Sequence, residues 1–148
     1  MHNPFDHLAK KVGKGALEPS GSTIVQYEIS RDAQHADLRH DPDRKRKRER
    51  ARLGLLGRIA ASLCLLDVFG HPLGAAELRA CISKHFAHWE ECVRKTRALN
   101  KRRREKGLRP VRLVEPLLWI IAAAASAPML HKIGARSAEG WPPGVYLV

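Results

Sequence analysis

The 148-residue sequence predicts an α/β fold in which helices flank a mixed β-sheet. Three observations support this prediction. Residues 63–69 form an apolar run with a single charge, Asp67, and such a run is typical of a strand buried on both faces. Residues 23–29 alternate between apolar and polar side chains, which indicates a half-buried strand. A long helical pattern begins after Gly74 and follows the apolar run.

The first half of the chain is expected to hold a helix, a strand hairpin and a second helix. Residues 3–12 begin with an Asn-Pro pair, which is typical of a helix start, and the glycines that follow them are expected to end this helix. The strand of residues 23–29 can pair with residues 35–40 across a polar turn. Residues 44–61 are basic first and apolar later, and they predict one helix that two glycines weaken.

The second half begins with the long helix, where Glu77 is placed to cap the free amides and Gly107 supplies the stop. Residues 111–114 form a short extended candidate, residues 117–127 must be buried as helix or as strand and then helix, and residues 144–148 look like an apolar strand. The buried stripe of the long helix is predicted to consist of Leu78, Ile82, Phe86, Trp89 and Val93.

The net charge of +12 comes from two short segments. Residues 44–52 hold seven basic side chains and one acid, and residues 94–112 hold ten basic side chains and one acid. Such patches suit nucleic acid, and DNA is the expected partner; the alternative is a solvated helix face or a disordered tail. The predicted nucleic-acid contacts are Arg44, Lys45, Arg46, Lys47, Arg48, Lys101, Arg102, Arg103, Arg104 and Lys106.

Several features predict a single cytoplasmic domain spanning residues 1–148. Three cysteines without a CxxC pair suggest a reducing compartment. Asp6, Lys10 and Lys11 lie where a signal peptide would need apolar residues. The longest uncharged run, residues 116–130, is too short to span a membrane, so no membrane partner is expected.

Two aspartates, Asp37 and Asp67, are candidate metal ligands because each lies on a predicted strand and the two strands are expected to be neighbours. Two carboxylates close together repel each other, and a hard divalent cation such as Mg²⁺ or Mn²⁺ relieves that repulsion. A metal held in this way can activate water and stabilise a phosphodiester transition state. The alternative for Asp67 is a structural hydrogen-bonding role inside the sheet.

A second group of candidate ligands lies along the long helix. Cys81, His85, His88 and Cys92 follow one another at steps of four, three and four residues. Neighbouring pairs could each offer two ligands, but four residues over this length cannot converge on one tetrahedral ion. We therefore expect these side chains to be packing residues rather than a zinc site.

Five segments together resemble the PD-(D/E)XK nuclease superfamily, and within it the recombination-promoting nucleases, a transposase-like family. The segments are Asn3–Lys10, Ala36–Leu38, Leu65–Asp67, Glu77–Thr96 and Val114–Leu117. The resemblance implies a restriction-endonuclease-like core and Mg²⁺-dependent DNA endonuclease activity. It implies metal binding and catalysis by Asp37 and Asp67, with Asp6 and Lys10 supporting them from the first helix.

One position departs from the family pattern. The second carboxylate of the superfamily is followed two positions later by Lys, or by Gln in the recombination-promoting branch, and here that residue is Phe69. Phenylalanine can neither coordinate a metal nor hold a water. Two functions therefore stay open, a metal-dependent endonuclease or an inactive nucleic-acid-binding or interaction domain on the same fold; an assembly module that uses the C-terminal apolar strand is a third. Family members are usually longer, which predicts a C-terminally truncated member.

Overall fold

The computed structural model describes the backbone of residues 4–28 and 35–148, and side chains within residues 7–27 and 35–148. Its centre is a four-stranded sheet with the order β1-β2-β3-β4. The strands are β1 (Gly21–Glu28), β2 (His35–Pro42), β3 (Cys64–Leu73) and β4 (Leu117–Ala125). The pairs β1/β2 and β2/β3 are antiparallel and β3/β4 is parallel, so the prediction of a mixed sheet is confirmed.

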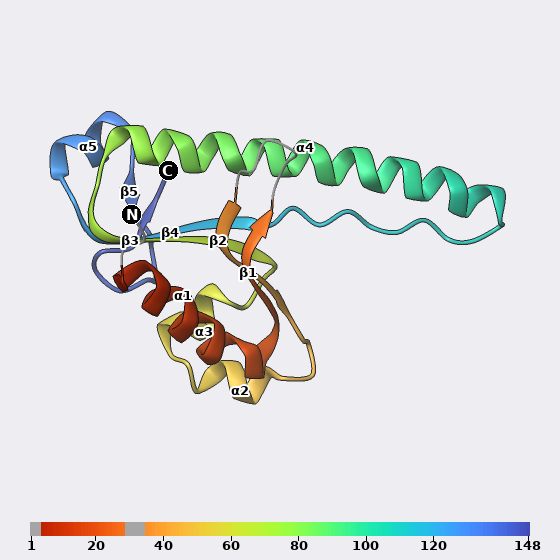
Figure 1. Ribbon diagram of the computed structural model, residues 1–148, viewed down its shortest axis with the longest axis horizontal. Coiled ribbons are helices and arrows are strands. Elements are labelled where there is room, and N and C mark those ends of the chain that lie inside the picture. The colour runs from red at the N-terminus through yellow and green to blue at the C-terminus, as the bar shows by residue number, and fades with distance from the viewer. Residues whose placement is uncertain (1–3, 29–34) are drawn as a thin grey trace.

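The helices cover the two faces of this sheet (Figure 1). On one face lie α1 (Pro4–Leu17), α2 (Lys47–Ala51) and α3 (Leu55–Ile59). Along the other face runs α4 (Ala75–Glu105), which connects the parallel strands β3 and β4 as a crossover helix must. The smaller elements are a 3₁₀ turn, η1 (Glu18–Ser20), then α5 (Ala127–Lys132) and a separate two-stranded sheet of β5 (Arg136–Ser137) and β6 (Tyr146–Leu147).

The core confirms that the apolar run forms the central strand. Residues 64–67 of β3 are all buried, because β2 and β4 flank the strand and helices cover both of its faces. Leu66 belongs to one apolar cluster with Leu17 of α1 and Ile59 of α3, whereas Leu65 packs on the opposite face with Ala87 of α4. Successive side chains of β3 point to opposite faces of the sheet, so the strand is buried on both faces, as predicted.

The N-terminal helix is longer than predicted and buries different residues. It passes through both glycines to Leu17, because Gly13 allows α1 to approach the sheet closely: a Cβ atom there would lie 2.7 Å from Leu38 Cδ1. The helical spacing of Phe5, Leu8, Ala9 and Val12 predicts one apolar face, but Leu8 and Val12 are 58% and 60% exposed. The glycine is a packing position rather than a stop signal.

The single helix predicted for residues 44–61 is wrong. The chain forms two short helices, α2 and α3, because Gly54 between them adopts a φ of 56°, a left-handed conformation that glycine accepts readily. The predicted strand at residues 111–114 is also absent, and these residues are extended without ladder pairing within the described part of the chain. Residues 117–127 follow the second alternative, a strand and then a helix, and the C-terminal strand pairs with β5 outside the main sheet.

The long helix begins and ends as predicted, but its predicted buried stripe is only partly confirmed. The Gly74 amide donates to Glu77 Oε2 at 2.8 Å, which confirms the cap, and Gly107 follows the helix with a φ of 67°. Leu78 is buried as predicted, whereas Phe86 is 59% exposed. The fully buried partners of Leu78 are Cys81 and His88, so the side of α4 with the cysteine and histidine residues faces the sheet.

Candidate active site and nucleic-acid interface

The two predicted acids lie together where the β2/β3 ladder opens. Backbone pairing between these strands runs from His40↔Cys64 to Leu38↔Leu66, and Asp37 and Asp67 are the next residues along each strand. At this point the carboxylates, instead of backbone carbonyls, accept the hydrogen bonds between the strands. Asp67 Oδ1 accepts from the Asp37 amide at 3.3 Å, and Asp37 Oδ2 accepts from the Val68 amide at 2.8 Å. Each acid is therefore fixed by the backbone of the neighbouring strand, as the prediction of neighbouring acids required.

Lysines approach this pair from both layers of helices. Lys10 of α1 lies 2.9 Å from Asp37 Oδ1, and Lys84 of α4 lies 2.7 Å from Asp67 Oδ1. The Lys84 ammonium also donates to the His35 carbonyl at 2.8 Å. The structure thus joins three predicted residues, Lys10, Asp37 and Asp67, with one that the sequence analysis missed, Lys84. We call these four residues the acid–lysine cluster.

The cluster is largely closed to solvent. The Asp67 side chain is 2% exposed and the Lys84 side chain 17%, whereas Asp37 is the most open member at 20%. A buried carboxylate is tolerated only when a cation and donors surround it, and Lys84 supplies the cation. Asp67 Oδ2 is nonetheless buried without a hydrogen-bond partner in the described part of the chain. The Cys81 thiol, which hydrogen-bonds to the Asp67 carboxylate, is the neighbouring donor, and a cation is the alternative partner for this oxygen.

The donor chemistry of the cluster fits a hard divalent cation. Asp67 Oδ2 and the Asp37 carboxylate are oxygen ligands of the type that Mg²⁺ and Mn²⁺ prefer. No group of three His, Cys, Asp or Glu ligands occurs among the described residues, so water or substrate oxygens would complete such a site. The nearby Cys81 thiol is no ligand of this kind, because burial and the neighbouring Asp67 carboxylate raise its pKa to about 12.

A strained backbone position lies beside the cluster. In the β1/β2 hairpin, Val25 pairs with Leu38 and Tyr27 with Ala36, so that Gln26 stands opposite Asp37. Gln26 has a φ of 50°, which is uncommon for a residue with a side chain and costs on the order of 1 kcal/mol. Such strain is found preferentially at functional sites, and here it adjoins the most open acid of the cluster.

The fourth predicted residue of the site is Asp6, and two further side chains, Phe69 and His71, follow Asp67 on β3. Asp6 lies on α1, but its side chain is outside the described residues. Phe69 makes an edge contact with His71, at 5.7 Å between ring centroids. His71 in turn lies 3.4 Å from Glu77 at the start of α4 and thus outside the cluster. His71 is the polar side chain that follows Asp67 on β3, and it contacts Glu77 rather than the cluster, so Lys84 on α4 is the cation at the Asp67 carboxylate.

Lys84 was missed because the predicted buried stripe of α4 did not include the side that carries Cys81 and His88, which are buried. The residues that face the sheet are spaced three or four apart, and Lys84 lies between Cys81 and His88 in that series. A buried aspartate on a strand, followed by a helix with a lysine on its sheet-facing side, indicates an ion pair between the two residues. This pattern was hidden by the more conspicuous row of large apolar residues on the neighbouring face.

The cysteine and histidine residues of α4 make contacts within the protein. His85 Nε2 lies 2.7 Å from the Pro116 carbonyl, and His88 contacts Cys92 Sγ at 3.4 Å. Burial lowers the pKa of His88 to about 4 and raises that of Cys92, so the pair is a neutral imidazole and a neutral thiol. These groups make protein contacts in the structure, and the neutral thiol of Cys92 is no activated nucleophile.

The second basic segment forms a projecting arm. We define the arm as residues 94–112, which comprise the last part of α4 and the chain that returns from it (Figure 1). Asn100 joins the two limbs by donating to the Val111 carbonyl at 3.0 Å and accepting from the Val111 amide at 2.7 Å. Arg103 Nε also donates to the Arg109 carbonyl at 2.7 Å. Lys101, Arg102, Arg104 and Lys106 are exposed, as the predicted contacts require.

The first basic segment lies apart from the arm. Arg44, Lys45, Arg46, Lys47 and Arg48 are exposed around α2, on the face of the sheet opposite α4 (Figure 1). Arg46 has a structural role there, since its guanidinium donates to the Pro19 carbonyl at 3.0 Å. The two predicted patches are therefore separate surfaces rather than one continuous interface.

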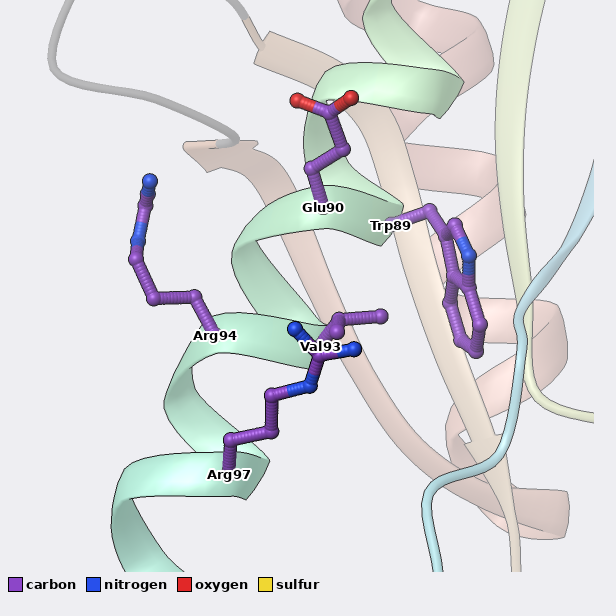
Figure 2. Close-up of a pocket in the computed structure, with 5 residues that line it drawn as sticks. All are labelled: Trp89, Glu90, Val93, Arg94 and Arg97. Carbon is purple, nitrogen blue, oxygen red and sulfur yellow. The ribbon is translucent and has the colours of Figure 1, made fainter.

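A hollow of about 400 Å³ lies on α4 where the arm begins. Figure 2 shows Trp89 and Val93 on one side of the helix, Arg94 pointing away on the other, and the Arg97 side chain turned back toward Val93. An indole beside guanidinium groups suits stacking with a nucleobase. None of the acid–lysine cluster lines this hollow, so it belongs with the arm and not with the carboxylates.

Comparisons with known proteins leave the family open. No protein-family model matches the chain, and neither the curated proteins nor the solved structures contain a match. Among the described residues, no helix has both the length and the apolar character that crossing a bilayer requires. The function is therefore inferred from the geometry of the acid–lysine cluster and the arm.

Proposed function

We propose that this chain is a nucleic-acid-binding domain with a restriction-endonuclease-like core that hydrolyses phosphodiester bonds of DNA with the help of Mg²⁺ or Mn²⁺. The observation that carries the proposal is the contact of 2.7 Å between Lys84 Nζ and Asp67 Oδ1. Phe69 deprives the strand of the polar group expected two residues after the second acid. Lys84 brings an ammonium to the same carboxylate from the helix that follows.

Each member of the cluster has a role that its chemistry allows. Asp37 and Asp67 would hold the cation, the latter through the buried Oδ2 that lacks a protein partner. A divalent cation bound there supplies a Lewis acid and an acidic water. Lys84 is placed to orient that water and to offset charge that develops on the phosphate. Lys10 holds the Asp37 carboxylate in position through their contact of 2.9 Å.

The arm is near enough to deliver a substrate to this cluster. Lys84 and Arg94 are ten residues apart on one continuous helix, which corresponds to about 15 Å at 1.5 Å per residue. A duplex is wide enough to span that separation while its phosphates contact the arm. Arg94 and Lys95 both pair with Glu91, so the exposed cations farther along the arm are better candidates for phosphate contacts.

A second candidate function is a catalytically inactive nucleic-acid-binding domain. The observation that favours it is the charge balance of the cluster, in which each carboxylate already has an ammonium within 3 Å. Two such pairs satisfy the buried acids without a metal, and a dication would have to bind beside two ammonium groups. The arm would still bind nucleic acid in this case.

Plasmid nicking distinguishes the two functions. We expect wild-type protein to nick supercoiled plasmid in the presence of Mn²⁺, and Mg²⁺ to support a similar or lower rate. Asp37→Asn should lower the nicking rate by about 100-fold or more, because it removes a metal ligand while conserving shape. Asp41→Asn is the matched control, since it makes the same change on the same strand at a carboxylate that is 55% exposed.

Binding of the same plasmid at low salt is measured alongside nicking. Retained binding and metal-dependent nicking that is lost only in Asp37→Asn would support the endonuclease. Retained binding without metal-dependent nicking by the wild type would show the inactive domain instead. Equal nicking by Asp37→Asn and Asp41→Asn would point to a contaminating nuclease and remove the support for the cluster.

A further inference from the structure

The outer edge of β4 is an unpaired apolar strand. β4 has a hydrogen-bonded neighbour on the β3 side alone within the described part of the chain. Its nine residues, Leu-Leu-Trp-Ile-Ile-Ala-Ala-Ala-Ala, contain no charge, no proline and no glycine. Ile121 is 37% exposed, and most of the alanines are exposed as well. An edge of this kind is a template for pairing with another strand.

The opposite edge of the sheet lacks this character. β1 is the other outer strand, and it carries Ser22, Gln26 and Glu28 as well as the left-handed Gln26 backbone that breaks its regular geometry. Polar side chains and distortions are the usual means of protecting an edge from pairing. The chain therefore protects one edge of its sheet and leaves the other open.

The backbone of β4 fixes which of its residues point their polar groups outward. The Leu117 amide donates to the Leu63 carbonyl, so residue 117 and every second residue after it face β3. The amides and carbonyls of residues 118, 120, 122 and 124 therefore face the open side. An antiparallel partner strand can form hydrogen bonds with these amides and carbonyls only in registers that place its own outward-facing residues opposite them.

We propose that the open edge of β4 pairs with β4 of a second copy of this chain, antiparallel, about a twofold axis at Ile121. This register joins 118 with 124 and 120 with 122, so the outward groups of both strands meet in about eight interchain hydrogen bonds. Ile121 then faces its own symmetry mate in a non-hydrogen-bonded pair.

Side-chain volume favours the same register. The side chains in the first half of β4 are large and those in the second half are small. A twofold axis at Ile121 places the large side chains of one chain opposite the small side chains of the other. Trp119 lies opposite Ala123, Leu118 opposite Ala124 and Ile120 opposite Ala122 of the second chain. Cross-strand neighbours of this kind interdigitate without crowding, whereas a parallel pairing in register would oppose the large residues to one another.

Charge also selects this edge for a contact between identical chains. Each chain carries a net charge of +12, so two copies repel each other over most of their surface. Residues 116–130 are the longest uncharged run of the sequence, and β4 lies within it. Two copies can approach there with the basic segments held away from the contact. The product is a closed dimer with one continuous eight-stranded sheet, because each copy has one such edge.

Solution mass tests this dimer. With a chain mass of 16.6 kDa, nuclease-treated protein in about 0.5 M salt should sediment as a dimer of about 33 kDa. Ile121→Lys should convert it to a monomer, because two ammonium groups would meet across the axis in an apolar contact. Ile24→Lys is the matched control on the β1 edge, where Ile24 is 43% exposed, and it should leave the dimer intact.

The outcomes are decisive in either direction. A monomeric wild type at about 50 µM would overturn the proposal, as would a dimer that survives Ile121→Lys. Open-ended aggregates would also contradict it, because the proposed pairing closes. If Ile121→Lys proves unfolded by circular dichroism, oxidation of Ile121→Cys decides instead.

The cysteine test uses the geometry of the twofold axis. Non-hydrogen-bonded antiparallel partners have Cα atoms about 4.5 Å apart, which is within disulfide range. Ile121→Cys should therefore form an interchain disulfide on mild oxidation, and Ile24→Cys should not. Wild-type protein is the second control, because Cys64 and Cys81 are buried and Cys92 is partly buried. If Ile121→Cys forms no covalent dimer, Ile121 does not lie at a twofold axis and the proposed pairing is wrong.

Discussion

The two halves of α4 belong to one uninterrupted helix of 31 residues, yet their polar residues have opposite roles. In the first half, Lys84 and His88 lie against the sheet and are largely buried. In the second half, lysine and arginine side chains surround a helix that projects past the sheet (Figure 1). The first half holds the acid–lysine cluster in place, and the second presents positive charge to a partner.

The difference shows that helix formation and core packing are separate requirements. An isolated helix of about a dozen residues is marginal in water, but the arm continues a helix that the sheet has already nucleated. Asn100 then fastens the returning chain to it through two hydrogen bonds. Substitutions in the first half should therefore alter stability, and substitutions in the second half should alter binding.

The largest expected effect is that of Lys84→Met. This change leaves the buried Asp67 carboxylate without its cation, and breaking a buried pair in this way costs about 3–5 kcal/mol. We expect urea denaturation to show a loss of that size in the free energy of unfolding. Lys95→Met is the control in the same helix, because Lys95 is 74% exposed, and surface pairs of this kind contribute about 0–1 kcal/mol.

The double variant Asp67→Asn/Lys84→Met refines this test. Removing both charges should recover a substantial part of the lost stability, because no ion is left buried alone. A loss below about 1 kcal/mol for Lys84→Met would mean that Asp67 is not the buried anion that the contacts indicate.

A smaller effect is expected from the titration of His88. Burial lowers its pKa from 6.5 to about 4, with Arg39 as a further cause, so the folded state keeps the imidazole neutral. Between these two pH values the unfolded chain binds more protons, and stability should fall as the pH decreases from about 7 to 4. The contribution of this residue is on the order of 3 kcal/mol, since one pKa unit corresponds to about 1.4 kcal/mol.

Comparison with His88→Gln isolates this contribution. Glutamine cannot be protonated in this range, so the variant should lose less stability than the wild type over the same pH interval. His40, whose pKa burial also lowers, stays in both proteins and cancels in the difference. Parallel pH profiles for the two proteins would show that His88 is solvated in the folded state.

The sequence predicted those features that depend on local pattern. The apolar run of residues 63–69, the hairpin before it and the capped start of α4 each have a periodicity or a capping residue that identifies them. The pairing of Asp37 with Asp67 also followed, because both were expected on neighbouring strands. The resemblance to nucleases contributed Lys10, which lies at Asp37 as the family pattern implies.

Features that depend on how the layers fit together were not predicted. Gly13 marks a close approach to Leu38 rather than a helix end, and only the packed structure distinguishes the two. The row of Phe86, Trp89 and Val93 has helical spacing, but Phe86 is exposed and the other two are only partly buried. The residues of α4 that pack against the strands are those of the neighbouring row, which includes Cys81 and His88. Lys84 could be recognised as the partner of Asp67 only once the sheet-facing side of α4 was known.

The smallest effect on stability, and the sharpest test of the division within α4, is expected from neutralising the arm. Replacing Lys101, Arg102 and Arg104 with glutamine should change the free energy of unfolding by less than about 0.5 kcal/mol, because all three side chains are exposed. Arg103 is left in place, since it fastens the arm by donating to the Arg109 carbonyl. Each phosphate contact that is lost lowers the salt dependence of binding by about 0.9 in log–log terms.

The plot of log affinity against log salt concentration should therefore become shallower by about 2–3 units if all three side chains contact phosphates. The matched control replaces Arg44, Lys45 and Lys47, three exposed cations near α2 on the opposite face. A slope that changes only in the arm variant would identify the arm as the primary interface, and equal changes would mean that nucleic acid wraps around both faces. An unchanged slope in the arm variant, with stability also unchanged, would mean that its charges serve solubility alone and that the second half of α4 has no nucleic-acid partner.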